Sequence, residues 1–172
     1  MESKGTIAVG AWNGFAGERL VRDMLLFLCD RQPSAPVTPA MVERTQDGAF
    51  QLGKKQEDSA FLPPEGDKGP QSVVWSIGAV AYYLMMGVPV FGGMAGTLQT
   101  PSTPVPAIPP RKCSRELASL LSRMLAFNPQ DRPDLAAIAA EAASVQETPR
   151  RMLKGEFHPE LADDSFWKEE MV

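Results

Sequence analysis

Few residues of this sequence could carry out chemistry by their type and spacing alone. His158 is the single histidine of the 172-residue chain, so a Ser-His-Asp or Cys-His mechanism would depend on it. It lies in the charged stretch GEFHPELADD close to the C-terminus. Cys29 and Cys113 form no CxxC pair and lie beside apolar residues, which is typical of buried free thiols and unlike a zinc site. We therefore expect no catalytic residue, no metal site and no cofactor.

The overall charge argues against a nucleic-acid-binding protein. The net charge is −4, whereas a general nucleic-acid binder needs a basic patch that releases counterions. The longest basic cluster is Arg150, Arg151 and Lys154 with Glu147 and Glu156 on either side, which is typical of a solvated helix end. The first ten residues hold no apolar run long enough for a signal peptide. We expect a cytoplasmic protein with reduced thiols.

The longest uncharged stretch, from Val73 to Phe91, approaches the roughly twenty apolar residues that span a membrane. Gly87 and Pro89 should end a helix near Met86, and the Gly/Pro-rich loop that follows could not lie in lipid. A helix that is apolar on all sides but too short to span is a buried central helix. We expect this helix over Val73–Met86, with a membrane-tethered subunit as an alternative.

Further elements are expected on both sides of the central helix. The apolar spacing over residues 17–30 predicts an amphipathic helix. Asp47-Gly48 is a strong hairpin signal, because both residues tolerate positive φ, and it predicts two short strands, Met41–Thr45 and Ala49–Gly53.

The last third of the predicted domain is helical. Ser114 is a plausible N-cap for a Leu-rich helix, and Asp134 can cap a last, Ala-rich helix. The predicted fold is therefore mainly α with a short β-hairpin. Its parts are an N-terminal segment 1–16, a helical domain 17–145 and a charged, aromatic tail 146–172.

Three stretches occur in an order that is typical of one known family. They are VTPAMV…DGAFQLGKK, PPE…SVVWSIGAVAYYLMMGVPVF and ELASLLSRMLAFNPQDRPDLAAI. In this order they resemble parts of the C-terminal lobe of a eukaryotic-type protein kinase. The first is similar to the catalytic loop with the hairpin that leads into the Mg²⁺-binding segment. The second is similar to the Ala-Pro-Glu motif with the central helix, and the third to the Leu-rich helix with its Arg-Pro turn. The resemblance covers residues 17–145 and implies a kinase C-lobe-like helical domain.

The sequence departs from the family at every position that the family uses for catalysis. The family's catalytic Asp and its metal-binding Asn correspond here to Pro36 and Met41. The Asp-Phe-Gly motif begins at Lys54 and continues with Lys55, and two cations would repel Mg²⁺. Val73 replaces the buried Asp that anchors the family's catalytic loop, which implies a loop with nothing left to hold. The resemblance thus implies a pseudokinase that binds neither ATP nor Mg²⁺.

The family's N-terminal lobe is expected to be absent. Only about sixteen residues precede the first helix, and they hold no GxGxxG phosphate loop. A structural feature of the family is retained, however: Glu65 of Pro-Pro-Glu and Arg132 of Arg-Pro match its buried ion pair, which joins this loop to the last helices. We expect the two side chains to form a salt bridge with low exposure.

Two classes of function follow from the resemblance. The first is a non-catalytic protein-interaction or regulatory module, a pseudokinase reduced to its C-lobe, with an architecture analogous to KIND domains, which reuse a kinase C-lobe to bind peptides. The alternative is an atypical nucleotide-binding or phosphotransfer protein with relocated residues such as Asp23, Asp30 and Asp47. In the first case the partner is another protein, and a second copy of the chain, forming a homodimer, is a further candidate.

A short motif indicates a class of protein that could bind this chain. VPAIPPR, residues 105–111, fits the SH3-ligand pattern φPxφPx+ through Pro106, Pro109 and Arg111, and such segments dock as polyproline II helices. The other interpretation is an ordinary loop that is stiffened by its prolines.

The tail carries more apolar surface than a solvated tail needs. Phe157, Leu161, Phe166 and Trp167 are large apolar residues among acidic ones, and burying large aromatics is strongly stabilising. We predict that part of residues 156–167 packs against the domain, in this chain or in a neighbouring copy, with Trp167 as the anchor.

Overall fold

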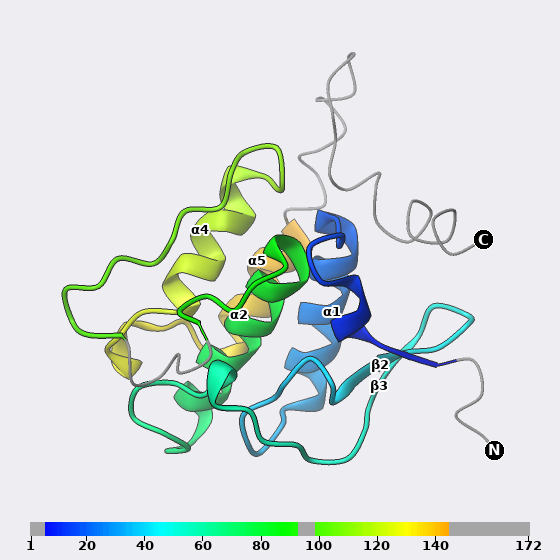
Figure 1. Cartoon of the computed structure of the whole chain (residues 1–172), viewed down its shortest axis with the longest axis horizontal. Coiled ribbons are helices and arrows are strands. Elements are labelled where there is room, and N and C mark those ends of the chain that lie inside the picture. The colour runs from blue at the N-terminus through cyan, green and yellow to red at the C-terminus, as the bar shows by residue number, and fades with distance from the viewer. Residues whose placement is uncertain (1–5, 93–98, 145–172) are drawn as a thin grey trace.

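The computed structural model describes residues 6–92 and 99–144. Over these residues the protein is a mainly α domain of four helices with a small three-stranded antiparallel sheet (Figure 1). The helices are α1 (Glu18–Arg31), α2 (Pro70–Met86), α4 (Arg115–Met124) and α5 (Leu135–Ser144). The strands are β1 (Ile7–Ala8), β2 (Val42–Arg44) and β3 (Phe50–Leu52), in the order β1-β2-β3.

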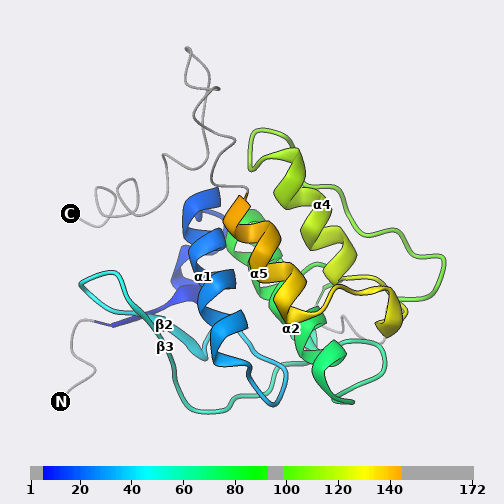
Figure 2. The ribbon, with the colours of Figure 1, turned by 180° about the vertical axis from the view of Figure 1, so that it is seen from behind.

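Helix α2 occupies the middle of the domain. It lies between α1 and α4 in Figure 1 and in the reverse view of Figure 2, and α5 packs against α1 and α4. The predicted buried helix over Val73–Met86 is confirmed, and it begins three residues earlier, at Pro70. Proline suits the first position of a helix because it has no N–H to leave unpaired. Gly87 ends the helix in the left-handed conformation with φ 81°, as the sequence indicates.

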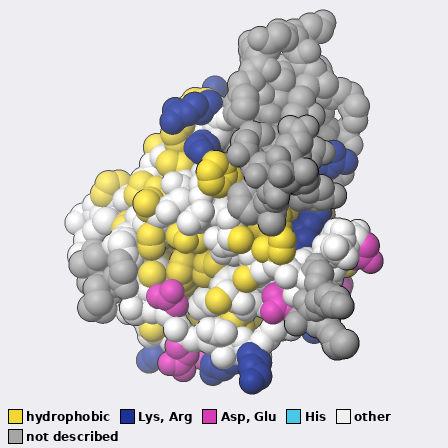
Figure 3. All heavy atoms as spheres, turned by 45° about the vertical axis from the view of Figure 1, so that its right-hand side comes forward, with side chains coloured by type: hydrophobic (Ala, Val, Ile, Leu, Met, Phe, Trp, Pro, Cys, Tyr) yellow, Lys and Arg dark blue, Asp and Glu magenta, His cyan; other side chains and the backbone are white. Residues whose placement is uncertain are grey.

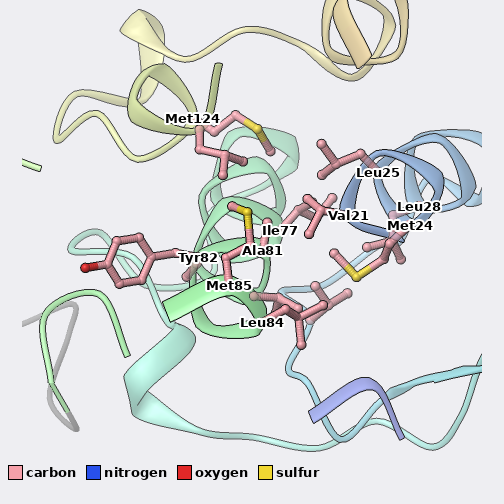
Figure 4. Packing of buried hydrophobic residues seen from close by; sticks show 14 of the residues in the cluster. Val21, Met24, Leu25, Leu28, Ile77, Ala81, Tyr82, Leu84, Met85 and Met124 are labelled. Carbon is pink, nitrogen blue, oxygen red and sulfur yellow. The ribbon is translucent and has the colours of Figure 1, made fainter. Parts of the chain in front are cut away.

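The core is assembled around α2 from three helices. Side chains of α1, including Val21 and Leu25, and Met124 of α4 gather around Ile77 and Met85 of α2 (Figure 4). All five are fully or almost fully buried. No helix in the part of the chain that the structure describes is long and apolar enough to cross a membrane.

Glycine at position 78 lets α2 and α4 approach closely. A Cβ atom added to Gly78 would lie 3.0 Å from the Cβ of Met124 and 3.4 Å from the Leu125 side chain. Both neighbours are fully buried, so neither can move aside without disturbing the core. Gly78 therefore sets the spacing of the two helices.

The N-terminal segment is part of the domain in the structure. Strand β1 pairs with β2, matching Ile7 with Arg44, and the short 3₁₀ helix that follows, Val9–Trp12, buries Val9 and Trp12 in the core. We did not predict this third strand, because two residues are too few to show an alternating pattern.

The predicted hairpin is confirmed, with a three-residue loop. The N–H of Thr45 donates to the carbonyl of Ala49 at 2.8 Å, which leaves residues 46–48 as the loop. Gly48 alone adopts positive φ, at 93°, so Asp47 does not use the tolerance that the sequence suggested. A three-residue loop with glycine in the left-handed position is a common hairpin connection.

The two C-terminal helices begin at the predicted caps. The hydroxyl of Ser114 accepts from the N–H of Leu117 at 3.2 Å, and a carboxylate oxygen of Asp134 accepts from the N–H of Ala137 at 2.8 Å. The tail 146–172, including His158 and the predicted anchor Trp167, lies outside the described residues.

We predict that Gly78→Ala destabilises the domain and that Gly78→Val destabilises it more. Overfilling a well-packed core costs about 1–3 kcal/mol, and this outweighs the roughly 1 kcal/mol that alanine gains over glycine in a helix. Urea unfolding measures the change, with Ala140→Val on the exposed face of α5 as the control. A more stable Gly78→Ala variant would show that α2 and α4 are not in close contact.

Candidate functional site

A single arginine connects three segments of the chain. Each of the five N–H groups of Arg132 donates a hydrogen bond. The Nε atom donates to the carbonyl of Ala126 at 2.8 Å, and one terminal nitrogen donates to Glu65 Oε2 at 2.7 Å and to Gln71 O at 2.8 Å. The other terminal nitrogen donates to Glu65 Oε1 at 3.1 Å and to Phe127 O at 3.0 Å. The Arg132 side chain is 0% exposed. The planar guanidinium fits this arrangement because it presents five donors in fixed directions.

The carboxylate of Glu65 is held from a second direction as well. The hydroxyl of Ser72 donates to Glu65 Oε2 at 2.8 Å, and the N–H of Lys68 donates to that hydroxyl at 2.9 Å. Burial on its own would raise the pKa of the Glu65 carboxyl, but the hydrogen bonds from Arg132 and Ser72 lower that pKa below its usual range. The structure thus brings the predicted pair together as a bidentate ion pair with 19% of the Glu65 side chain exposed.

The segment that resembles the catalytic loop is held against α2 by a side chain other than that of residue 73. Val73, which stands where the family has an anchoring Asp, is buried at the start of α2 and offers no polar side chain. The hydroxyl of Ser76, one turn later, accepts the N–H of Val37 at 2.9 Å and donates to the carbonyl of Val73 at 2.7 Å. A hydroxyl on the next turn thus holds this segment against α2.

The other replaced positions lie close to this loop. The carbonyl of Met41 accepts the N–H of Gly53 at 2.7 Å, so the segment with Pro36 and Met41 runs beside the segment with Lys54. Met41 is buried, Pro36 is half-buried and Lys54 is exposed. The structure therefore brings these positions into one region, and none of these side chains has an oxygen atom with which to bind Mg²⁺.

Two adjoining hollows open in this region, and together we call them the Thr38 groove. The larger has a volume of about 560 Å³ and the smaller of about 340 Å³. Thr38, Phe61 and residues 56–58 line both of them. One face of the molecule carries hydrophobic side chains across its middle, with acidic side chains among them (Figure 3).

A residue that lines the groove has a buried hydroxyl without a partner. Thr38 is 4% exposed, and its Oγ1 atom has no hydrogen-bond partner. An unsatisfied buried hydroxyl costs on the order of 1–3 kcal/mol. The oxygen itself lies beneath the surface of the groove wall.

Our sequence interpretation missed two polar connections in the core. Glu18 is 1% exposed, and its carboxylate accepts both the N–H and the hydroxyl of Ser114 at 2.7 Å. The indole N–H of Trp75 donates to the Gln99 side chain at 3.0 Å, which in turn donates to the Leu125 carbonyl at 2.8 Å. The partners are 96, 24 and 26 residues apart in sequence, so no local pattern could have paired them.

The SH3-ligand pattern is partly occupied by the domain itself. Val105 and Ile108, the φ positions of the pattern, pack against the core. With Pro106 they line a hollow of about 310 Å³ against α4. Pro109 is half-buried and Arg111 is exposed. This packing favours the interpretation of a stiff loop over that of a free ligand.

Both cysteines are buried free thiols, as expected. Burial raises the pKa of the Cys29 thiol to about 11, and burial together with the nearby charge of Glu18 raises that of Cys113 to about 12. Since the thiolate is the reactive form, neither thiol is suited to nucleophilic chemistry. Within residues 6–92 and 99–144, no three Cys, His, Asp or Glu side chains gather as a metal site would require.

Comparisons with known proteins give no family assignment. No protein-family model matches the sequence, and no curated protein matches it either.

We predict that neither cysteine of the folded protein reacts with Ellman's reagent on the timescale of minutes, while both react in denaturant. The physical reason is the raised pKa and burial of both thiols. Absorbance at 412 nm follows the reaction. A stoichiometric reaction of one thiol in the folded state would contradict the placement of that residue in the core.

We predict that Glu65→Gln destabilises the domain at pH 7 by about 3–5 kcal/mol, because it leaves the buried Arg132 charge without its partner. The folded-state pKa of Glu65 is lowered, so its contribution is fully present above the unfolded pKa of about 4.3. It is lost as the pH falls through the folded-state pKa. Urea unfolding between pH 7 and pH 3 measures both effects.

The control for this experiment is Glu141→Gln, which breaks an exposed pair with Arg123 on the surface and should cost about 1 kcal/mol or less. Equal losses for Glu65→Gln and Glu141→Gln would show that Glu65 and Arg132 form an ordinary surface pair.

Proposed function

We propose that this chain is a non-catalytic protein-interaction or regulatory module built on the architecture of a protein kinase C-lobe. Several features support the likeness: a buried central helix, a hairpin before it, and an Arg-Pro turn whose arginine binds the glutamate of Pro-Pro-Glu. In this account the chain is a pseudokinase that contributes a shaped surface.

One observation supports a non-catalytic role most directly. Pro36, Met41 and Lys54 occupy the positions of the base and of the two metal ligands, yet the loop that carries the first two is held against α2 through Ser76. The loop thus keeps a defined position without the groups needed for phosphoryl transfer. A surface that is retained while its chemistry is lost is suited to binding another protein, in the manner of KIND domains, which are analogous in architecture.

The alternative, a nucleotide-binding or phosphotransfer protein with relocated residues, has less support. Asp47 lies in the hairpin loop, where its carboxylate accepts from Thr45. Asp23 and Asp30 lie on α1. These carboxylates do not converge on one site among the described residues, and a phosphate would need a cluster of donors rather than separate acids.

We predict that ATP with Mg²⁺ leaves the melting temperature of the protein unchanged. A ligand at 100 times its dissociation constant would stabilise a binding protein by about 2.7 kcal/mol, which for a domain of this size raises the melting temperature by several degrees. A thermal shift titration makes the measurement, with an active protein kinase as the positive control. A concentration-dependent rise would favour the alternative function.

The interaction itself is tested by crosslinking the chain in its native cells and identifying what it captures. The proposal expects the same protein in stoichiometric amounts in independent preparations. It expects that protein to bind the purified chain directly, with a dissociation constant in the micromolar range or tighter. A folded chain that captures no partner would contradict the role of an interaction module.

A further inference from the structure

We propose that the hollow between α4 and residues 105–108 binds a small organic carboxylate with a compact apolar body, through the Tyr82 hydroxyl and the Arg115 guanidinium. We call it the Tyr82 hollow. Besides these two residues it is lined by residues 105–108 and by Ala118, Ser119, Leu121, Ser122 and Leu125. The inference goes beyond the proposed interaction role and does not depend on it, because no described residue lines both this hollow and the Thr38 groove.

The Tyr82 hollow has walls that the fold holds in place. The segment that leads into α4 runs beside this helix in Figures 1 and 2. Val105 and Ile108 of that segment pack against the core, which anchors one wall. On the facing wall, Leu121 is fully buried and Ala118 leaves space because its side chain is short. The interior of the hollow is therefore apolar and formed before any ligand binds.

The size and the rim of the hollow restrict the ligand to a small amphiphilic molecule. The volume of about 310 Å³ is at the lower end of the roughly 300–1,000 Å³ of pockets that hold small molecules. Three polar residues of α4, Arg115, Ser119 and Ser122, line the hollow and are exposed. They follow one another at intervals of four and three residues, so they lie on one face of the helix. A ligand with an apolar body and a polar head group matches this arrangement.

The hydroxyl of Tyr82 is a hydrogen-bond donor that a ligand can reach. Tyr82 is 5% exposed, and its side chain points away from Ile77 and Met85 of the core (Figure 4). No described residue bonds its hydroxyl, which, unlike that of Thr38, remains accessible to solvent. Burial raises the pKa of the Tyr82 phenol, so the phenol keeps its proton at neutral pH. In such a partly apolar environment a hydrogen bond to an anion is stronger than in water.

The charge of the hollow selects an anionic head group. Among the described residues that line it, Arg115 alone is charged, and no carboxylate of a described residue pairs with it. A guanidinium presents two parallel N–H donors that fit a carboxylate. A phosphate would need a larger cluster of donors than one arginine and one phenol supply. The hollow therefore favours a carboxylate with a single negative charge.

A titration of the full chain with 4-methylpentanoate at pH 7, followed by ¹H–¹⁵N NMR spectra, tests the inference. We expect saturable shifts of the amide signals of Ala107, Ile108 and Ser119, which line the hollow. The expected dissociation constant is about a millimolar, which a ligand of about eight non-hydrogen atoms can reach. The matched probe 4-methylpentan-1-ol has the same apolar body without the charge. It should bind about tenfold more weakly, because a hydrogen bond to a charged group is stronger than one to a neutral group.

Variants of the hollow identify the groups that bind the carboxylate. Tyr82→Phe and Arg115→Gln should each weaken the binding of 4-methylpentanoate about tenfold, because each removes a donor to the charged head group. Ala118→Leu should abolish binding, because it fills the space. The matched controls are Tyr83→Phe, at a residue that lines the Thr38 groove, and Arg123→Gln, at an exposed arginine of the same helix. Both controls should bind as the unmodified protein does, and the NMR spectrum of each variant verifies its fold.

Three results would overturn the inference. The first is the absence of saturable shifts at concentrations well above a millimolar. The second is equal affinity for 4-methylpentanoate and for the alcohol, and the third is binding that Tyr82→Phe and Arg115→Gln weaken no more than their controls do. None of these results bears on the proposed interaction role, which is tested by the captured partner and by the titration with ATP and Mg²⁺.

Discussion

The fold depends on one buried guanidinium. Arg132 donates to the loop before α2 through Glu65, to the first turn of α2 through Gln71, and to the turn after α4 through Ala126 and Phe127. A fully buried positive charge is very costly unless it is paired and every donor is satisfied. A shift of any of these three segments would therefore leave a buried donor of Arg132 unpaired. In this way the contacts of Arg132 fix the start of the central helix relative to the last two helices. The rest of the domain packs on that arrangement.

Sequence reasoning succeeded where a local pattern of residues determines the local structure. The absence of charge predicted the buried α2, Gly87 predicted its end, Asp47-Gly48 predicted the hairpin, and Ser114 and Asp134 predicted two helix starts. It failed where two distant residues must meet. The contact of Glu18 with Ser114 and that of Ser76 with Val37 cannot be recognised from the periodicity or spacing of the residues. Strand β1 is too short to show an alternating pattern. The candidate site was predictable in its ion pair, because both members lie in short motifs, but its groove was not, since a hollow is a property of packing.

The contacts of Ser76 and Arg132 bear on the proposed likeness to a kinase C-lobe. A catalytic site needs both a rigid frame and groups with suitable chemistry. Here Ser76 holds the loop and Arg132 holds the helices, and in the proposed likeness to kinases Pro36, Met41 and Lys54 stand where the base and the metal ligands would be. The domain also has a hollowed, partly apolar surface at the Thr38 groove. Hollows of this kind are commonly binding sites, in line with the interaction role proposed above.

The most direct measurement of this account is a double-mutant cycle between Glu65→Gln and Arg132→Met, with the free energy of unfolding determined for the two single variants and the double variant. If the two residues form the desolvated pair that holds the frame, removing both costs less than the sum of the single losses, with a coupling energy of about 1–3 kcal/mol. If the losses add to within about 0.5 kcal/mol, the two side chains act independently. The fold would then not depend on their contact, and the structural basis of the kinase C-lobe likeness would be contradicted.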